Sequence, residues 1–410
     1  MPVKRNFMKF LVLTVMIPAL LLSACTLTAV KPLAPEAPLR LESVLLEEWP
    51  VLEDDSDFEG LERAVTYSLG YLKGRPPGGR LVLADRELSR QELIDSLTLF
   101  LNLLQRGSDR RAMTRQIKES FNFYRFVQGG ASSPLLMTGY YEPVLRGSRV
   151  PSAPYLYPVY RVPEDQVFIQ AGRFSDALKG RKWVARLEGN QVVPYYTRQE
   201  IDQGKALEGK DLEILWVDDP IKLFFMHIQG SGQVLLEDGS SVRVGYGGSN
   251  GHSYFAIGRE LVQRGLLKAE EVSLQSLYAY LRDHPEEKQK VMNLNSSYVF
   301  FREVRGGPFG SLGLPLTPGR SAAVDLKFFP SGGLGFISGL KPSLDSRGRI
   351  KSWEPFSRWV CFQDSGGAIK GPSRLDLYWG TGAEAEMAAG HLRHPGSVFI
   401  LLKKPNSRGE

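Results

Sequence analysis

The sequence has 410 residues and a formal net charge of +6, of which three positive charges lie in the first 24 residues. The +3 that remains is too mild for nucleic-acid binding, which asks for a clustered basic face. The 42 glycines and 26 prolines favour two domains that are rich in strands and turns.

Residues 1–24 have the pattern of a secretory signal. A short apolar run over 10–22 follows basic residues and is too short for a permanent transmembrane helix. The segment 22–25, Leu-Ser-Ala-Cys, resembles the bacterial lipobox. That resemblance implies that Cys25 is acylated and becomes the mature N-terminus, anchored to a membrane. The basic residues are Lys4, Arg5 and Lys9.

Thr26 follows the cysteine at the position where bacterial retention signals resemble aspartate, so the lipobox resemblance implies the periplasmic face of the outer membrane. With Cys25 acylated, Cys361 has no partner for an intramolecular disulfide. We therefore expect Cys361 to be a small buried hydrophobe.

Helical signals precede strand signals along the chain. Residues 25–57 show no sustained periodicity and predict a tether. Apolar spacing predicts helices over 58–73 and 111–121, and Ser89 to Glu92 fits a capping box that opens a further helix. Shorter helices are predicted over 256–265 and 272–283. The predicted strands are 155–162, 192–196, 214–217, 222–229, 242–246, 297–302, 322–327 and 397–403.

The regular alternation of strands and turns indicates a mainly β fold with N-terminal helices. One domain of strands begins near Leu135 and ends after Arg305, and the sequence between them is long enough to house another. An insertion of one barrel into a loop of another explains this pattern.

The segment 362–382 is the strongest candidate for chemistry, because it combines two carboxylates with glycines, a lysine and aromatic rings. Leu375, Leu377 and Trp379 alternate with polar positions, which predicts a strand that presents Asp376 and Tyr378 on one face. Asp364 precedes Ser-Gly-Gly, so we expect it on a turn whose glycines take positive φ. The alternative is an aspartate-capped turn beside a solvated strand.

Other chemistries lack their motifs. The five histidines show no HExxH spacing and no CxxC occurs, so no metal or cofactor is predicted. No G-x-S-x-G and no G-x-x-x-x-G-K-[ST] occurs either. Carboxylate chemistry with saccharide recognition remains, because sugar hydroxyls need directional hydrogen bonds and sugar faces stack on aromatic rings. The glycine-rich polar segments that fit such a site are 138–142, 229–233 and 245–251.

Together these motifs resemble the lytic murein transglycosylase A family, membrane-bound enzymes that cleave the glycan strands of peptidoglycan. The resemblance covers about residues 130–403 and the lipobox. Its motifs are TGYYEP at 138–143, HIQGSG at 227–232, GY at 245–246, NG at 250–251, NSSYVFF at 295–301, GLPLTPGRSAAVD at 313–325 and the segment 362–382.

The resemblance implies a double-psi β-barrel that carries an inserted second β-barrel domain. The barrel domain is expected over 58–145 and 300–405, with helices in 58–121 and a three-aspartate region over 306–403. The insertion is expected over 146–299, and residues 25–57 are the expected tether.

The resemblance also implies the site. It makes Asp376 the catalytic acid and Asp364 its supporting neighbour, while Lys370 fits a surface lysine as well as a substrate-binding one. A single carboxylate suffices because the 6-hydroxyl of the same muramic acid attacks, giving a 1,6-anhydro product. The residues expected to bind substrate are Thr138, Tyr140, Gln229, Gly230, Ser231, Tyr246, Asn250, Asp325, Lys370 and Tyr378.

Two other functions remain compatible with the sequence. A hydrolase would use Asp364 as a base and leave reducing ends. A non-catalytic, lipid-anchored scaffold would bind glycan through Thr138, Gln229 and Asn250 without needing paired aspartates. The expected partners are peptidoglycan strands and the membrane, with cell-wall synthesis proteins as further candidates and no nucleic acid.

Overall fold

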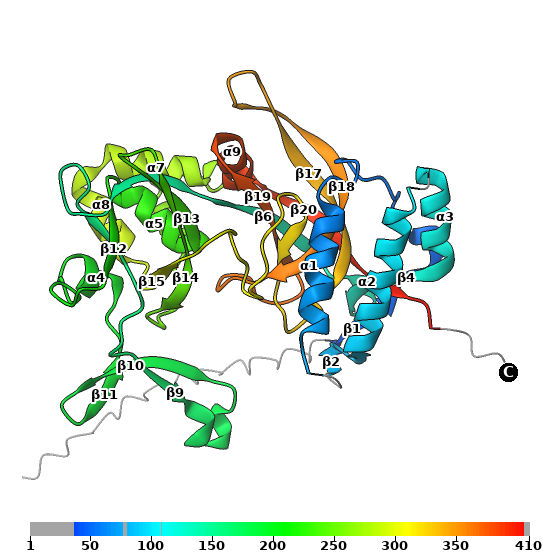
Figure 1. The fold of residues 1–410 in the computed structure, drawn as a ribbon, viewed down its shortest axis with the longest axis horizontal. Helices are drawn as coiled ribbons and strands as arrows, with labels where there is room; N and C mark the ends of the chain where they lie inside the picture. The colour runs from blue at the N-terminus through cyan, green and yellow to red at the C-terminus, as the bar shows by residue number, and fades with distance from the viewer. Residues whose placement is uncertain (1–36, 77–79, 108, 406–410) are drawn as a thin grey trace, which may run out of the picture. The chain divides into compact units, whose positions relative to one another are not determined.

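The computed structural model describes residues 37–76, 80–107 and 109–405, which form a mainly β protein (Figure 1). Three helices precede most of the strands. Ser89 and Glu92 form the capping box that begins the second of them, and Asp109 caps the third. These helices are α1 (Leu61–Lys73), α2 (Arg90–Gln105) and α3 (Arg110–Ser120).

A closed ring of six strands, counted within the described residues, forms the first β unit. The last strand closes the ring because it pairs with β17 on one side and with β6 on the other. The pairs β16–β18 and β19–β6 are parallel, and the other pairs in the ring are antiparallel. In ring order the strands are β20 (Arg393–Lys403), β17 (Leu334–Leu344), β18 (Ile350–Asp364), β16 (Ser321–Ala323), β19 (Arg374–Thr381) and β6 (Leu135–Glu142).

The core of this barrel is continuous with the helices. One cluster of buried apolar side chains contains residues of the ring strands, α1 and α2. Trp359 of β18 and Phe100 of α2 meet in it with ring centroids 4.8 Å apart. Cys361 lies in the same cluster with 0% exposure, as expected for a small buried hydrophobe.

Residues 38–57, which we expected to belong to a tether, are instead part of the folded unit. Strand β1 (Leu39–Ser43) pairs with β4 (Phe121–Gln128), which pairs with β20. Asp54 and Arg320 form a buried ion pair at 2.6 Å. The sequence pattern missed this segment because a short strand and a single buried charge create no periodicity. The signal segment and Cys25 lie outside the described residues.

A second sheet is built between β6 and β16, so the chain leaves the barrel and returns to it (Figure 1). A parallel bridge joins Arg161, just after β8, to Phe301 of β15, so the two edges of this sheet meet. In sheet order the strands are β15 (Val299–Glu303), β14 (Ser241–Ser249), β13 (Ser231–Leu236), β7 (Val144–Ser148), β12 (Glu213–Val217) and β8 (Tyr157–Tyr160).

The predicted strand over 222–229 is wrong, because this segment belongs to helix α5 (Pro220–Gln229). The Asp219 carboxylate accepts from the backbone N–H groups of Ile221 and Lys222, and Pro220 occupies the first helical position. The apolar residues 223–226 are consecutive and all buried, so this run does not show a helical period.

Short elements complete the described part of the chain, in which no helix is long and apolar enough to span a membrane. The helices are α4 (Arg198–Asp202), α6 (Ile257–Gln263), α7 (Leu274–Asp283), α8 (Pro285–Asn293), α9 (Ala383–His391) and the 3₁₀ turns η1 (Leu46–Glu48), η2 (Ala171–Arg173), η3 (Asp176–Leu178) and η4 (Ala269–Glu271). The remaining strands are β2 (Arg80–Leu83), β3 (Arg86–Ser89), β5 (Ala131–Ser132), β9 (Val167–Gln170), β10 (Lys182–Glu188) and β11 (Gln191–Pro194).

Polar contacts join the second sheet to the barrel beside β6. Glu142, which has 0% exposure, receives two hydrogen bonds from Arg243 of β14 at 2.7 and 3.1 Å and one from Thr381 of β19 at 2.9 Å. The Tyr141 backbone N–H donates to the Gln229 side chain at 3.1 Å. These bonds fix the end of β6, which carries Thr138 and Tyr140.

Candidate active site

The two candidate catalytic aspartates lie on opposite sides of one short strand. Ala323 of β16 is the register partner of Asp376 in β19 and also of Asp364 in β18. Adjacent strands are about 4.8 Å apart, so the two aspartate Cα atoms are separated by about 10 Å. The barrel therefore brings together two carboxylates that the sequence separates by a loop.

Strand β19 alternates as its sequence predicts. Leu375 and Leu377 have 0% exposure and belong to the core cluster. Asp376 and Tyr378 lie on the other face, where they pair with Thr138 and Tyr140 of the parallel neighbour β6. The rings of Tyr140 and Tyr378 are 5.2 Å apart, so two tyrosines adjoin the Asp376 carboxylate on this face.

Asp376 is a half-enclosed carboxylate with two polar partners. Its side chain is 14% exposed. Arg374 contacts it through Nε at 3.1 Å and Nη2 at 3.3 Å, and the Thr138 hydroxyl donates to Oδ1. Burial raises the pKa of Asp376 above its ordinary value, although the Arg374 charge acts in the opposite direction. The site thus favours a protonated carboxyl more than water does.

Asp364 is the last residue of β18 rather than part of the following turn. It accepts from the backbone N–H groups of Ser311 at 2.7 Å and Ser365 at 2.8 Å. Burial raises its pKa, and these two donors oppose the rise. We expected positive φ at Gly366 and Gly367, and this expectation is wrong. Strand β18 continues to Asp364, and the loop that follows has no left-handed backbone at either glycine.

The charges of both aspartates act on the side chain of Tyr140. Its hydroxyl is buried and makes no hydrogen bond of regular geometry with any residue that the structure describes. Burial raises the pKa of Tyr140 well above its ordinary value, and the charges of Asp364 and Asp376 raise it further. Tyr140 is therefore a neutral phenol that faces both acids.

Sequence reasoning missed three residues beside the aspartates. Arg374 lies two positions before Asp376 on the same strand face, and period-two alternation was the signal for it. Ser311 comes from a distant loop and carries no local signal. Tyr254 lies just before α6, in the part of the chain that contains the second sheet. Burial raises the pKa of Tyr254, the Arg374 charge lowers it and the Asp376 charge raises it, so the ring lies close to Arg374 and Asp376.

The predicted residues of the HIQGSG motif end helix α5 and begin β13. The Gln229 side chain holds the backbone of Tyr141. Gly230 ends the helix in the left-handed region, with φ at 79°, where a side chain would be strained. Ser231 is the half-buried first residue of β13. These residues set the position of β6 beside the site.

The other predicted binding residues are more dispersed. Asn250 is 1% exposed, and its amide bonds the backbone of Tyr196, Ser296 and Tyr298, so it fastens a loop. Tyr246 is 54% exposed on β14 and is free to stack on a ligand.

The remaining two predicted residues belong to the loops around β18 and β19. Asp325 accepts from the backbone N–H groups of Lys327 at 3.1 Å and Gly371 at 2.8 Å, which ties the loop between β18 and β19 to the turn after β16. Lys370 is exposed in that same loop. Asp325 thus organises the loop, and Lys370 remains a solvent-facing cation.

A six-stranded β-barrel with an intervening β unit and two half-buried carboxylates defines a carboxylate enzyme with an insertion in its barrel. Family models match both parts: the MltA specific insert domain over residues 136–302 and the 3D domain over residues 320–402.

Curated relatives agree with these models. Membrane-bound lytic murein transglycosylase A of Vibrio cholerae is 33% identical over 276 residues, which cover 67% of each chain. The Escherichia coli K12 protein of the same name is 30% identical over 309 residues, covering 74% of each. The chain belongs to the lytic murein transglycosylase A family.

Solved structures match the described fold as well. A membrane-bound lytic murein transglycosylase from Agrobacterium tumefaciens superposes with a TM-score of 0.74 and 31% identity, covering 88% of this chain and 97% of that one. E. coli MltA with bound chitohexaose gives a TM-score of 0.65 and 26% identity, covering 90% and 95%.

Proposed function

We propose that this protein is a lytic transglycosylase that cleaves the β-1,4 bond between N-acetylmuramic acid and N-acetylglucosamine in peptidoglycan, with 1,6-anhydro-N-acetylmuramic acid as the product. Its relatives are named lytic murein transglycosylases, and one neighbouring structure contains a bound glycan chain. The observation that carries the proposal is the enclosed Asp376 carboxyl, whose pKa is raised by burial. The proposed reaction needs a single group that donates and then accepts a proton, and the Asp376 carboxyl can do both.

In this proposal Asp376 acts first as an acid. Its proton goes to the glycosidic oxygen as the bond to the muramic acid C1 breaks. The Asp376 carboxylate then takes the proton of the 6-hydroxyl while the oxygen of that hydroxyl forms a bond to C1. Asp376 thereby returns to its protonated starting state. Because nucleophile and electrophile belong to one sugar ring, the attack avoids the entropic cost of bringing in water.

Asp364 has a supporting role in this scheme. It is held by two backbone N–H groups and faces Tyr140, which also faces Asp376. Both carboxylates raise the pKa of Tyr140, so this neutral phenol is the group through which Asp364 adjoins the Asp376 site. Thr138 and Arg374 fix the orientation of the Asp376 carboxyl through their hydrogen bonds.

The test is the variant Asp376→Asn, assayed on purified sacculi with mass spectrometry of the soluble products. We expect a folded protein that still binds glycan strands and loses at least about a hundredfold in turnover, as for removal of a general acid. Near-normal release of anhydro-muropeptides would refute the role of Asp376. Reducing ends would identify a hydrolase, and binding without cleavage by the wild type would identify a scaffold.

The finer architecture and the anchor belong to the same proposal. We assign a double-psi barrel to residues 58–145 and 300–405, an inserted domain to 146–299, and a lipid anchor to Cys25 on the periplasmic face of the outer membrane. The relatives named membrane-bound support the membrane assignment. The variant Cys25→Ser should move the protein from the membrane fraction to the soluble fraction, and its retention in the membrane would contradict the anchor.

A further inference from the structure

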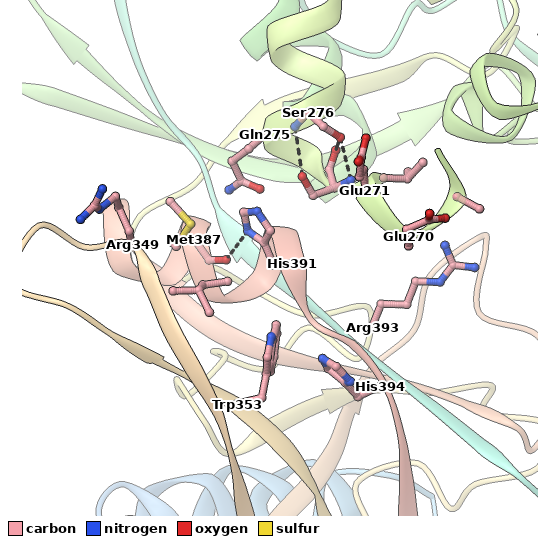
Figure 2. Close-up of a pocket in the computed structure, with 14 residues that line it drawn as sticks. Glu270, Glu271, Gln275, Ser276, Arg349, Trp353, Met387, His391, Arg393 and His394 are labelled. Atoms are coloured by element: carbon pink, nitrogen blue, oxygen red, sulfur yellow. Dashed lines mark hydrogen bonds between the residues drawn. The ribbon is translucent and has the colours of Figure 1, made fainter. Parts of the chain in front are cut away.

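A large cavity borders the barrel, and neither Asp364 nor Asp376 lines it. It has a volume of about 1220 Å³ and lies between η4 and α7 of the second β unit on one side, and the β17–β18 hairpin, the end of α9 and the start of β20 on the other (Figure 2). We call it the side cleft. Small-molecule sites commonly span roughly 300–1,000 Å³, so the side cleft is roomy enough for a short peptide.

The walls of the side cleft carry opposite charges. Glu270 and Glu271 line the wall formed by η4, and Arg349 and Arg393 line the barrel wall. Arg349 pairs with Asp345 at 2.9 Å, and Glu271 pairs with Lys268 at 2.9 Å. Neither Glu270 nor Arg393 has an ion-pair partner within the described part of the chain, and in Figure 2 Arg393 extends toward the Glu270 wall.

A hydrogen-bond acceptor in the wall also lacks a partner. The Gln275 Nε2 donates to the Glu386 backbone carbonyl at 3.0 Å, whereas its Oε1 is buried and accepts no hydrogen bond from the described residues. Gly390 makes this placement possible, since a Cβ there would lie 2.4 Å from that Oε1. That oxygen lies against α9 and is not open to the cleft, so Gln275 fastens α7 to α9 and does not contact a ligand.

Strand register connects the side cleft to the catalytic face. Arg393 of β20 is the register partner of Thr138 in β6, and Thr138 is the partner of Asp376 in β19. Paired residues in neighbouring strands point to the same face, and three adjacent strands span about 10 Å. A sugar ring held at Asp376 therefore has substituents within a short chain's reach of Arg393.

We propose that the side cleft binds the peptide that branches from N-acetylmuramic acid, a short chain with both carboxylate and amino groups. The inference rests on the proposed function for the sugar backbone. Fixed charges of both signs suit such a peptide, in which Arg393 binds a carboxylate and Glu270 binds an amino group. A muramic acid whose lactyl carboxyl is capped as an amide has no charge to match these side chains.

The experiment measures binding, so that it does not depend on turnover. Isothermal titration of the full mature chain uses two probes. One is a disaccharide of N-acetylglucosamine and N-acetylmuramic acid that carries its tetrapeptide, and the other is the bare disaccharide, in which the lactyl carboxyl is capped as an amide. We expect the peptide to tighten binding in the wild type. Arg393→Gln should weaken binding of the peptide-bearing probe about tenfold and leave the bare disaccharide unchanged, and Arg393→Lys should retain part of the affinity.

Three results would overturn the proposal: equal affinity of the wild type for both probes, an equal effect of Arg393→Gln on both, or no effect on either. Glu270→Gln provides a second variant on the opposite wall and should also act only on the peptide-bearing probe. Arg106→Gln, an exposed arginine at the end of α2, is the matched control and should change neither affinity. A wild type that binds the peptide yet releases no anhydro product from sacculi would contradict the proposed function alone.

Discussion

The two aspartates differ in what holds them. Asp376 shares a strand face with a guanidinium and a hydroxyl, whereas Asp364 ends a strand and is held by backbone N–H groups. Side-chain partners can rearrange when a proton leaves, but backbone donors favour the ionised form at all times. This contrast supports Asp376 as the group that exchanges protons.

At this scale Arg374→Gln gives a prediction about pH. Burial raises the pKa of Asp376 and Arg374 lowers it, so loss of the guanidinium should raise that pKa further. An acid is active while protonated, and activity is lost as pH rises through its pKa. We expect the alkaline limb of the pH–turnover profile to move to higher pH by about one unit or more.

The position of that limb, measured on sacculi, is the readout, because a change in rate alone would also follow from misplacing Asp376. Arg146→Gln removes an arginine paired with Asp218 elsewhere and should leave the limb in place. An unchanged limb in Arg374→Gln would argue that another group donates the proton.

Sequence reasoning reached the residues whose neighbours lie on the same strand. Period two placed Asp376 and Tyr378 on one face, and a resemblance supplied their roles. It could not show that Asn250 is enclosed by the backbone of Tyr196 and Tyr298, because those contacts join segments far apart in the chain. Burial of a polar side chain is decided by tertiary packing rather than by its flanking sequence.

At the scale of elements, helix α9 lies against β6 at a distance that only glycine permits. A Cβ on Gly139 would come within 2.8 Å of the Ala389 Cα and of the Trp379 indole nitrogen. Ala385 and Ala389 pack with Tyr141 in the same contact. Small residues on both elements thus let the helix hold the strand that carries Thr138.

Gly139→Ala should therefore lower the free energy of unfolding by about 1–3 kcal/mol, the usual cost of overpacking. Gly70→Ala is the matched control, since Gly70 lies inside α1 and a Cβ added there would meet nothing within 4 Å. That substitution should stabilise the protein by about 0.5–1 kcal/mol through helix propensity. Urea unfolding measures both, and a loss of equal size in the two variants would contradict the packing account.

Helices whose sequences alternate apolar and polar residues with a helical period were predicted well, and a largely buried helix was not. Helix α2 begins at the capping box that the sequence contains. Helix α5 was mistaken for a strand, because its buried apolar run over 223–226 has the same pattern as a buried strand. Asp219 and Pro220 were the local signals that distinguish the two cases.

For the whole molecule, the most deeply buried of the ion pairs that fasten the N-terminal segment to the barrel joins Asp54 to Arg320. Asp54 and Arg320 have 0% and 1% side-chain exposure, and the Asp54 carboxylate also accepts from the Trp359 backbone N–H at 3.1 Å. Burial opposes ionisation of Asp54, but Arg320 and the backbone donors lower its pKa below the ordinary value. The pair therefore contributes stability above the unfolded pKa, and this is lost as pH falls through the folded pKa.

Arg320→Met would leave that carboxylate buried without its cation and should cost about 3–5 kcal/mol of unfolding free energy at neutral pH. Chemical denaturation at pH 7 and again in acid is the measurement, and the deficit relative to wild type should shrink in acid as Asp54 becomes protonated. Arg80→Met removes an exposed pair with Glu87 and should cost less than about 1 kcal/mol. Similar losses in the two variants would rule out a special role for the buried pair.

At this scale an insertion of one run of strands into another was a prediction from the sequence, and in the structure the strands of the second sheet lie between β6 and β16. The order of strands around the barrel could not be predicted. The parallel pairs β16–β18 and β19–β6 join segments whose contact follows from closure of the ring, and no local pattern encodes closure.

Strand β20 closes the ring, and it is made after the strands with which it pairs. It pairs with β17, β4 and β6, and residues 393–403 are made after all three of those strands. Until then those strands have unpaired edges, which are the surfaces through which nascent chains associate wrongly. The ring therefore cannot close until β20 has been made, and a chain that lacks residues 393–403 has no strand to join β17 to β6.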